Sequence, residues 1–532
     1  MAYFAPMLPD NAPFSENQRA WLNGYLAGLF GAGGAGAVAP SAEAVVAAPA
    51  APAASSEPED FPWHDPALAL DDRLALAAGR PRARILMAAM AQLDCGQCGY
   101  LCQTYSEAIA AGTERDLARC VPGGKATARK LKELLAEAPA AVVAGAPTVA
   151  AAPQPVAPVG GRTGAVPAAL ARSDRLNGAG SDKDTRQIVF RLDGTGLDYQ
   201  VGDSLGVHAA NCPELVDAIV DCLGASRDLE VDCPDGSRRR LHEALALVCD
   251  VGRPSDEAIE VLASRAHAAE EADLLQAMAE GYPGSGPEEA DLLDLLVAFP
   301  SARPPVQELV SALGMLQPRL YSISSSPKAT PGEVHLTVAA VRYRRRDRLR
   351  KGVASIFLAE RTAPGASVPV FVQPTHGFRL PEQNDVPLIM IGPGTGIAPF
   401  RAFLQERRAL GAKGRNWLFF GDQHGATDFL YRDDIEGFAR DGLLTRLDTA
   451  FSRDQTDKIY VQHRMRQHAA DLWAWLQDGA RVYVCGDATR MARDVDTALV
   501  HIIAKQGRME MAGAKAYLAQ LAREQRYQRD VY

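Results

Sequence analysis

The stretch from Pro387 to Phe403 constrains the fold of this 532-residue chain more than any other. An apolar run leads into three glycines at alternate positions, and a helix-like pattern begins near Pro399. Glycines let the backbone approach a phosphate closely, and the free N–H groups at the start of a helix attract the same anion. We therefore predict a strand, a turn and a helix that bind a nucleotide. A turn without a ligand is the alternative, because Gly-x-Gly-x-Gly departs from the commoner Gly-x-Gly-x-x-Gly spacing.

A second apolar run begins at Ala480 and ends in the sequence Cys485-Gly486-Asp487. Apolar runs that alternate with helical segments are typical of an open parallel sheet, which binds its ligands at the carboxyl ends of the strands. We therefore predict that residues 386–532 form a Rossmann-like domain that binds a dinucleotide.

Composition argues against two classes of partner. The formal net charge is −9, whereas nucleic-acid-binding domains carry clustered basic residues. No apolar run in the sequence approaches the roughly 20 residues of a membrane span, and the N-terminus lacks a basic segment followed by an apolar one. We expect a cytoplasmic protein without nucleic-acid partners and without membrane insertion. Hydrophobic residues make up 47% of the chain, which is enough to bury cores in several domains.

Four cysteines lie close together, at Cys95, Cys98, Cys102 and Cys120. Four thiolates are the ligand set of a [4Fe–4S] cluster, and the glycines between them allow a loop to wrap around the cluster. A structural zinc site also takes four cysteines, but usually as two C-x-x-C pairs. Unligated or redox-active thiols are the third interpretation. We predict that residues 60–136 form a small iron–sulfur domain.

Two segments of low complexity separate the predicted domains. Residues 31–59 and 137–180 are rich in Ala, Pro, Val and Gly and lack a pattern that could bury a face, so we predict linkers. The second linker either lets the cysteine-containing domain move between a donor and an acceptor or only separates folding units. Within residues 1–30, an apolar pattern from Phe14 to Phe30 predicts an amphipathic helix. This helix either docks on a partner during assembly or packs against its own chain.

Residues 181–385 alternate between apolar and polar side chains, which predicts an antiparallel barrel. Helical patterns at about 213–316 predict that an all-helical insertion interrupts the barrel. After the insertion, the guanidinium of Arg319 is suited to bidentate hydrogen bonds with a pyrophosphate. The ring of Tyr321 is suited to pack against an isoalloxazine. Residues 352–355 predict a helix start that takes the same pyrophosphate. Taken one at a time, these three features have ordinary explanations: a surface arginine, a core tyrosine and a helix cap. In this order along the chain, they indicate an FAD site.

Residues 182–532 also carry a set of motifs that occur together in one family. Among them are Arg319-Leu-Tyr-Ser-Ile, Gly377-Phe-Arg-Leu-Pro, Ile389-Met-Ile-Gly-Pro-Gly-Thr-Gly-Ile-Ala-Pro-Phe, Tyr483-Val-Cys-Gly-Asp and the final Arg526-Tyr-Gln-Arg-Asp-Val-Tyr532. This region resembles the ferredoxin-reductase-like half of the diflavin reductases, most nearly the flavoprotein (alpha) subunit of bacterial NADPH-dependent sulfite reductase. The cysteine-containing segment separately resembles the small four-cysteine cluster domain of bacterial electron-transfer subunits. The resemblance implies a multidomain α/β plus β-barrel protein with an FAD barrel and a C-terminal NADP domain.

The resemblance also assigns roles by position. It implies FAD contacts from Arg319, Tyr321, Ser322, Gly352, Val353, Ala354, Ser355 and Tyr532. It implies NADPH contacts from Gly394, Thr395, Ser452, Arg453, Lys458, Tyr460, Gln462 and Asp487. It implies that Ser322, Cys485 and Asp530 are catalytic and lie beside the nicotinamide and the flavin. Without the family context, Cys485 would be a small apolar end of a strand and Tyr532 a frayed terminus.

The chain departs from the family in one domain. The family's flavodoxin-like FMN domain has no counterpart here, and the four cysteines stand in its place, so we expect no FMN. We predict that hydride passes from NADPH to FAD and that single electrons then pass through the [4Fe–4S] cluster to a partner metalloprotein.

Three hypotheses for the function follow from this prediction. The favoured partner is a haem-type subunit, the sirohaem subunit of assimilatory sulfite reductase, in a hetero-oligomer. The alternatives are a reductase that feeds nitrate reductase or a cytochrome, and a flavin and iron–sulfur redox sensor that is not an enzyme.

Overall fold

The structure is a computed structural model that describes residues 61–64, 68–92, 100, 102–114, 117, 119–120, 122–136, 164–282, 284–375 and 377–532. Several predictions lie outside these residues and stay predictions. They are the amphipathic helix within 1–30, the linker 31–59, most of the linker 137–180, and the positions of Cys95 and Cys98.

The first described part is a small helical module. It contains α2 (Leu70–Leu76), α3 (Arg82–Ala88), α4 (Cys102–Ala110) and α5 (Gly124–Ala136). The buried side chains of Leu86, Met90, Tyr105 and Leu131 form its core together with Cys102 and Cys120. Two of the four predicted ligands therefore lie in one hydrophobic cluster.

Six antiparallel strands form the predicted barrel, in the order β6-β3-β10-β1-β2-β7. They are β1 (Val166–Arg175), β2 (Thr185–Arg191), β3 (Ser204–Val207), β6 (Arg319–Ser322), β7 (Glu333–Ala339) and β10 (Ser367–Gln373). A bridge between Ile323 and Leu336 joins the two outer strands and closes the barrel.

The position of strand β1 shows that the predicted linker 137–180 extends too far toward the C-terminus. The strand lies inside residues 137–180, which we predicted to be a linker, and it pairs with both β10 and β2. Its alanine-rich sequence conceals the strand, since only Ala168 and Leu170 are buried.

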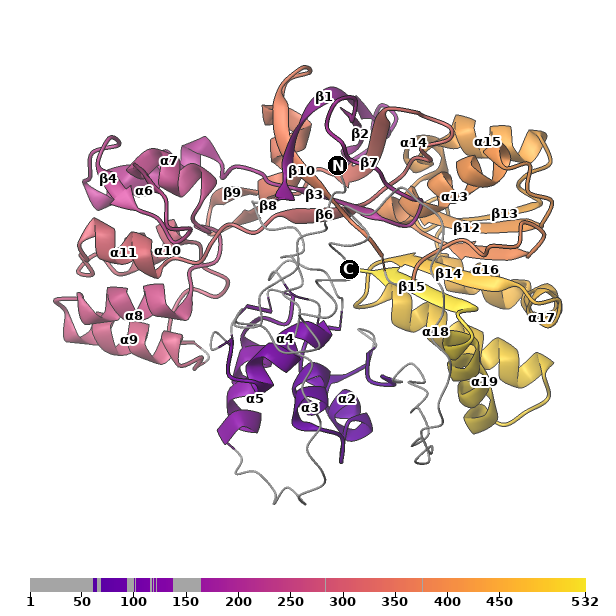
Figure 1. Cartoon of the computed structure of the whole chain (residues 1–532), viewed down its shortest axis with the longest axis horizontal. Helices are drawn as coiled ribbons and strands as arrows, with labels where there is room; N and C mark the ends of the chain where they lie inside the picture. The colour runs from indigo at the N-terminus through magenta and orange to yellow at the C-terminus, as the bar shows by residue number, and fades with distance from the viewer. Residues whose placement is uncertain are drawn as a thin grey trace, which may run out of the picture. The chain divides into compact units, whose positions relative to one another are not determined.

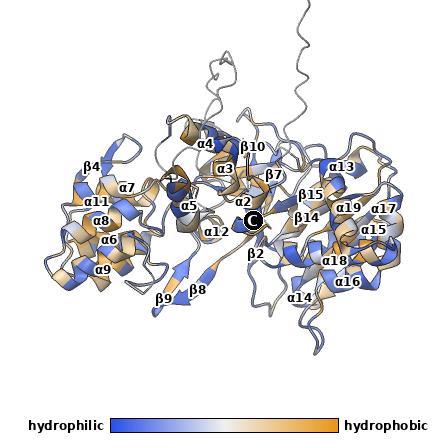
Figure 2. Ribbon diagram, turned by 90° about the horizontal axis from the view of Figure 1, so that it is seen from below, coloured by the Kyte–Doolittle hydropathy of each residue, from blue (hydrophilic) through white to orange (hydrophobic). Residues whose placement is uncertain are grey.

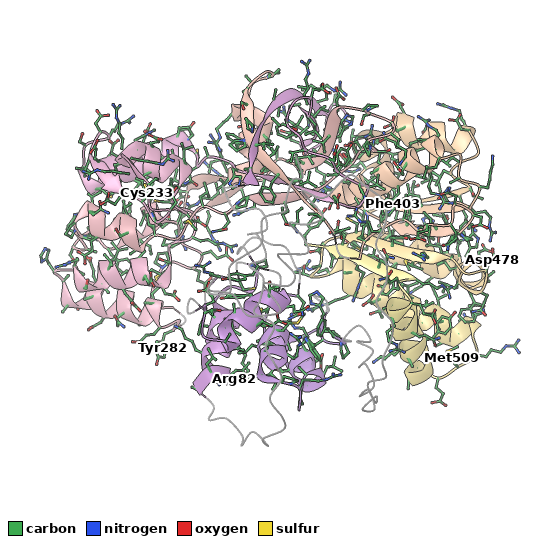
Figure 3. The ribbon with its side chains drawn as sticks, viewed as in Figure 1. Arg82, Cys233, Tyr282, Phe403, Asp478 and Met509 are labelled. Carbon is green, nitrogen blue, oxygen red and sulfur yellow. The ribbon has the colours of Figure 1, made fainter. Side chains whose placement is uncertain are left out.

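The insertion between β3 and β6 has a core of its own. Its helices are α6 (Pro213–Leu223), α7 (Leu241–Leu247), α8 (Asp256–Ser264), α9 (Ala269–Ala279), α10 (Leu292–Ala298) and α11 (Val306–Ala312). Cys233, labelled in Figure 3, and Cys249 are buried in this core. The insertion is not all-helical as predicted, because β4 (Glu230–Asp232) and β5 (Arg238–Arg240) form a hairpin within it.

A second hairpin attaches the insertion to the barrel. Strands β8 (Arg342–Arg345) and β9 (Arg348–Lys351) are largely hydrophilic (Figure 2). Arg348 forms ion pairs of 2.5 Å with Asp291 and 2.7 Å with Asp294 at the start of α10, and Arg350 pairs with the same two carboxylates. Both carboxylates are buried, so this arginine clamp compensates charges that would otherwise be costly to desolvate.

The C-terminal domain has the predicted open parallel sheet, in the order β13-β12-β11-β14-β15. The strands are β11 (Leu388–Ile391), β12 (Asn416–Asp422), β13 (Arg446–Phe451), β14 (Arg481–Gly486) and β15 (Tyr527–Val531). Helices α13 (Ala398–Ala409) and α15 (Arg432–Arg440) cover one face, and α16 (Val461–Gln467), α17 (Ala469–Gln477), α18 (Met491–Gln506) and α19 (Met511–Arg523) cover the other (Figure 1). Phe403 of α13 packs on Tyr483 of β14 with ring centroids 5.3 Å apart (Figure 3). None of the helices in the described ranges is long and apolar enough to cross a membrane.

The turn after β11 packs against β14 too tightly for a side chain. A 3₁₀ turn covers Gly394–Ile397 and continues into α13. A Cβ atom on Gly396 would lie 2.1 Å from the carbonyl oxygen of Cys485, and one on Gly392 would lie 2.4 Å from the carbonyl oxygen of Gly396. Both neighbours are backbone atoms, which cannot rotate away. The glycines at these two positions are therefore required by packing.

We expect Gly396→Ala to destabilise the nucleotide-binding domain. Overpacking of this kind costs about 1–3 kcal/mol, which lowers the thermal midpoint of such a domain by roughly 2 to 10 °C. The measurement is thermal unfolding of the FAD-loaded chain. Gly437→Ala is the matched control, because Gly437 lies within α15 with its nearest atom 3.9 Å away. That change removes backbone entropy from the unfolded chain and should leave the midpoint unchanged or raise it.

Candidate functional site

The glycine turn opens toward the carboxyl ends of β11 and β14. Gly394 has φ +58°, and no atom lies within 4 Å of the position that a Cβ would take there, so this side of the turn has room for a ligand. The first residues of α13 follow directly, and their N–H groups attract anions. The turn therefore fits the phosphate groups of a dinucleotide, as the sequence predicts for Gly394 and Thr395.

Three residues from different strands meet at one carboxylate. Asp530 is the register partner of Cys485 in the parallel pair β14–β15. Ser322, at the end of barrel strand β6, donates from Oγ to Asp530 Oδ2 over 2.6 Å. The Cys485 thiol lies 3.7 Å from the same oxygen. The structure thus brings together the predicted catalytic residues, which are up to 208 positions apart in the chain.

Burial shifts the pKa values of both acidic side chains in this cluster, Asp530 and Cys485. It raises the pKa of the Asp530 carboxyl, although the hydrogen bonds from Ser322 and Cys485 act in the opposite direction. Burial and the nearby Asp530 carboxylate raise the pKa of the Cys485 thiol well above its ordinary value. Cys485 is therefore a protonated hydrogen-bond donor and not a thiolate nucleophile.

Tyr532 is held at the same place by main-chain and side-chain bonds. Its N–H donates to the carbonyl of Gly486 over 3.0 Å, and its carbonyl accepts from the N–H of Ala488 over 3.1 Å. The phenol oxygen lies 2.7 Å from Thr395 Oγ1 in the glycine turn. The residue as a whole is 55% exposed, so the C-terminus lies at the surface while its side chain is bonded to the glycine turn.

The predicted FAD residues lie on β6 and at the start of a short helix. Tyr321 packs against the barrel core, and burial raises the pKa of its phenol. Gly352 precedes α12 (Val353–Ile356), which continues into a π-helical turn at Phe357–Arg361. A Cβ on Gly352 would lie 2.5 Å from Ser355 Oγ, so the packing of this hydroxyl disfavours a side chain at the position. We call residues 352–355 the cradle, and their predicted contact with a pyrophosphate, through Gly352, Val353, Ala354 and Ser355, stays a prediction.

One candidate for a cofactor contact carries no signal in the sequence. Gln373 is the register partner of Ser204, and Ser204 is the register partner of Ser322. The Gln373 side chain is buried, and its Oε1 atom has no hydrogen-bond partner among the described residues. A buried amide oxygen without a partner costs stability unless a ligand satisfies it. Only the strand pairing reveals that Gln373 lies in the same row as Ser322, with Ser204 between them.

The predicted 2′-phosphate pocket follows β13. The N–H of Ser452 donates to the carbonyl of Asp422, and the N–H of Arg453 donates to the carbonyl of Gln423, both over 2.9 Å. The side chains of Arg453, Lys458 and Tyr460 are exposed to solvent near this turn and at the start of α16. These groups are open to an anionic ligand.

Two predicted NADPH residues have structural partners. Gln462 donates to Asp494 of α18 over 3.0 Å. Asp487 caps α18 by accepting N–H groups from Thr489, Arg490 and Met491. These hydrogen bonds hold α16 and α18 in place at the carboxyl edge of the sheet.

Of the predicted metal ligands, the structure describes Cys102 and Cys120, which are both buried. Burial raises the pKa of the Cys120 thiol, while hydrogen bonds from the N–H groups of Ala91 and Gly123 and the nearby Arg73 act in the opposite direction. A Cβ on Gly123 would lie 2.9 Å from the Cys120 sulfur. Two main-chain N–H groups thus bond to the Cys120 sulfur, and its ligation of a cluster stays a prediction. Within the described residues, no three His, Cys, Asp or Glu side chains are grouped so as to hold a metal.

Comparison with known proteins identifies two domains. Residues 162–357 match the family model of the FAD binding domain. Residues 390–497 match that of the oxidoreductase NAD-binding domain.

The chain is also similar to proteins named sulfite reductase [NADPH] flavoprotein alpha-component. The protein of Bacillus subtilis is 46% identical over 388 residues, which cover 73% of this chain and 64% of the relative. That of Mannheimia succiniciproducens is 44% identical over 367 residues, covering 69% and 60%. That of Neisseria meningitidis is 45% identical over 369 residues, also covering 69% and 60%. The chain thus spans about three-fifths of the length of these relatives.

We expect Asp530→Asn to slow the reduction of bound flavin by about 100-fold, because the amide keeps the shape of the carboxylate but not its charge. Anaerobic stopped-flow absorbance measures this rate. Asp496→Asn is the matched control, since Asp496 also bonds to β15, through Arg529 over 2.9 Å, but away from Ser322.

The same variant should change the pH dependence of stability. Because the folded chain binds the Asp530 proton more tightly than the unfolded chain, wild type loses this stability as pH rises from about 4 through the folded pKa. Asp530→Asn cannot ionise, so its thermal midpoint should rise relative to wild type as pH increases above about 4. Flavin reduction at the wild-type rate would contradict the catalytic assignment, and a constant difference in midpoint would contradict the raised pKa.

Proposed function

We propose that this chain, an NADPH-dependent oxidoreductase, delivers electrons from NADPH through FAD and a [4Fe–4S] cluster to a partner metalloprotein. The observation that carries the proposal is the meeting of Ser322 from the FAD-binding barrel with Cys485 and Asp530 from the nucleotide-binding sheet. Hydride transfer needs a flavin from one domain and a nicotinamide from the other in direct contact. The edge shared by these two domains supports such a contact.

The chain's own residues supply binding and orientation. Arg319, Tyr321 and the cradle at Gly352 would hold FAD, which when bound accepts hydride and can release electrons singly. Ser322 and the protonated Cys485 thiol hold the Asp530 carboxyl group at one position, where it would lie beside the nicotinamide ring. The hydrogen-bonded side chains of Tyr532 and Thr395 would cover that place before the nucleotide binds.

The pocket after β13 favours NADPH over NADH. Ser452, Arg453, Lys458 and Tyr460 present a hydroxyl, two cations and a phenol, which suit a phosphate dianion. A site for NADH instead places a carboxylate on the ribose. The names of the similar proteins also give NADPH as their nucleotide.

The four cysteines would hold the cluster, which when bound exchanges one electron at a time. Two features support the assignment: the burial of Cys102 and Cys120 in one core, and the glycine beside the Cys120 sulfur. The favoured acceptor is the sirohaem subunit of an assimilatory sulfite reductase, and the similar proteins are named sulfite reductase [NADPH] flavoprotein alpha-component, which supports a sulfite reductase partner. Copurification with such a subunit, and NADPH-driven sulfite reduction by the pair, test this acceptor.

We expect Arg453→Ala to weaken NADPH binding by about 10- to 100-fold, because a hydrogen bond to a charged group contributes roughly 1.5–3 kcal/mol. Binding of NADH, which lacks the 2′-phosphate, should change by less than about twofold. Titration of the FAD-loaded chain with NADP⁺ and NAD⁺ gives both values. Equal losses for the two nucleotides would refute the pocket.

We expect the Cys98→Ser variant to lose most of its iron. Its activity with a protein acceptor should fall by more than about tenfold. Flavin reduction by NADPH should persist, because it precedes the cluster. Cys222→Ser is the control, since Cys222 packs against the core of the insertion. Iron analysis and absorbance after anaerobic reconstitution report the cluster. Zinc at these sulfurs, or full activity of Cys98→Ser, would contradict the proposed route.

A further inference from the structure

A loop of the FAD-binding barrel reaches the proposed 2′-phosphate pocket of the other domain. It spans residues 177–184, between β1 and β2. Arg453, the main cation of the pocket, has its guanidinium 3.9 Å from a carboxylate oxygen of Asp182 in this loop. The loop therefore places a negative charge beside the group proposed to bind a dianion.

Buried anchors fix this loop. The carboxylate of Asp428, at the end of α14 (Gly425–Asp428), is fully buried and accepts hydrogen bonds from Asn177, over 2.9 Å, and from Ser181. The N–H of Gly178 donates to the carbonyl of Thr427 over 2.7 Å. The residue before Asp182 and the residues at the loop's start are thus bonded to the nucleotide-binding domain.

The residue after Asp182 is anchored to the pocket itself. The Lys183 ammonium pairs with the carboxylate of Asp422, whose side chain is 1% exposed. Asp422 also accepts, at its main-chain carbonyl, the N–H of Ser452 over 2.9 Å. Asp422 therefore links both sides, because Lys183 of the loop and Ser452 of the pocket bind the same residue.

Asp182 itself stays open between these anchors. Its side chain is 88% exposed, whereas that of Arg453 is 49% exposed. An exposed ion pair at this distance adds little to stability. A phosphate dianion that approaches Arg453 competes with this carboxylate for the guanidinium and is repelled by it.

We infer that Asp182 is a specificity-determining residue that competes with the 2′-phosphate for Arg453 and so weakens NADPH binding without affecting NADH. Lys183 and Asp428 act as positioning residues for this carboxylate. This inference rests on the proposed function of the pocket after β13. The competing carboxylate keeps the affinity for NADPH and NADP⁺ moderate, which favours release of the oxidised nucleotide.

The test is calorimetric titration of the full FAD-loaded chain with 2′,5′-ADP and with 5′-AMP, which need no electron acceptor and no cluster. Asp182→Asn should bind 2′,5′-ADP about two- to fivefold more tightly than wild type, as expected for removal of one exposed charge. Its affinity for 5′-AMP should not change. The gain should shrink as salt rises from about 0.01 M to 1 M, because salt screens exposed charges. Asp182→Glu, which keeps the charge, should behave as wild type.

A double-mutant cycle separates this inference from the proposed pocket. In an Arg453→Ala background, Asp182→Asn should increase the affinity for 2′,5′-ADP by less than half as much as it does in wild type. The reason is that the cation for which Asp182 competes is absent. Asp198→Asn, an exposed aspartate of the same domain, is the control and should change neither affinity. Unchanged or weaker binding of 2′,5′-ADP by Asp182→Asn, or an equal change for 5′-AMP, would overturn the inference. If Arg453→Ala weakens both probes equally, the 2′-phosphate pocket itself is wrong.

Discussion

The Asp530 carboxylate is the interaction on which the arrangement of this site depends. It is buried between a barrel strand and a parallel sheet, and it is bonded to a hydroxyl from one and a thiol from the other. A buried charge is tolerated only when its partners are correctly placed. The two domains must therefore keep one relative position at Ser322. Within the nucleotide-binding domain, the close packing of Gly396 on Cys485 holds the glycine turn against the same strand.

Local sequence patterns predicted much of this fold. The strand, glycine turn and helix at 387–403, the strand that ends at Gly486 and the location of the insertion all depend on contiguous residues. Strand β1 was missed because its alanines and proline carry a weak pattern, and its place is set by pairing with β10, about 200 positions later. The hairpin inside the insertion was missed because each of its strands has only three residues.

The candidate site was predictable in its residues but not in its contacts. The resemblance gave Ser322, Cys485 and Asp530, and the structure shows that strand register makes the last two neighbours. The hydrogen bond from Asn177 to Asp428 spans 251 positions, and no local pattern encodes it. Gln373 was missed for the same reason, since its place in the row of Ser204 and Ser322 follows from two successive strand pairings. The cluster prediction depends on Cys95 and Cys98, and it stays a prediction.

The arginine clamp between the β8–β9 hairpin and α10 has a consequence for the flavin. The hairpin ends at Lys351, directly before the Gly352 cradle, and the two buried aspartates that it binds begin the helix α10. Local opening of the insertion would release the arginines and the main chain that leads into the cradle. By thermodynamic linkage, occupancy of the cradle and order in the insertion must support each other. The insertion is in this sense an energetic part of the cofactor site, although none of its helices was predicted to touch the flavin.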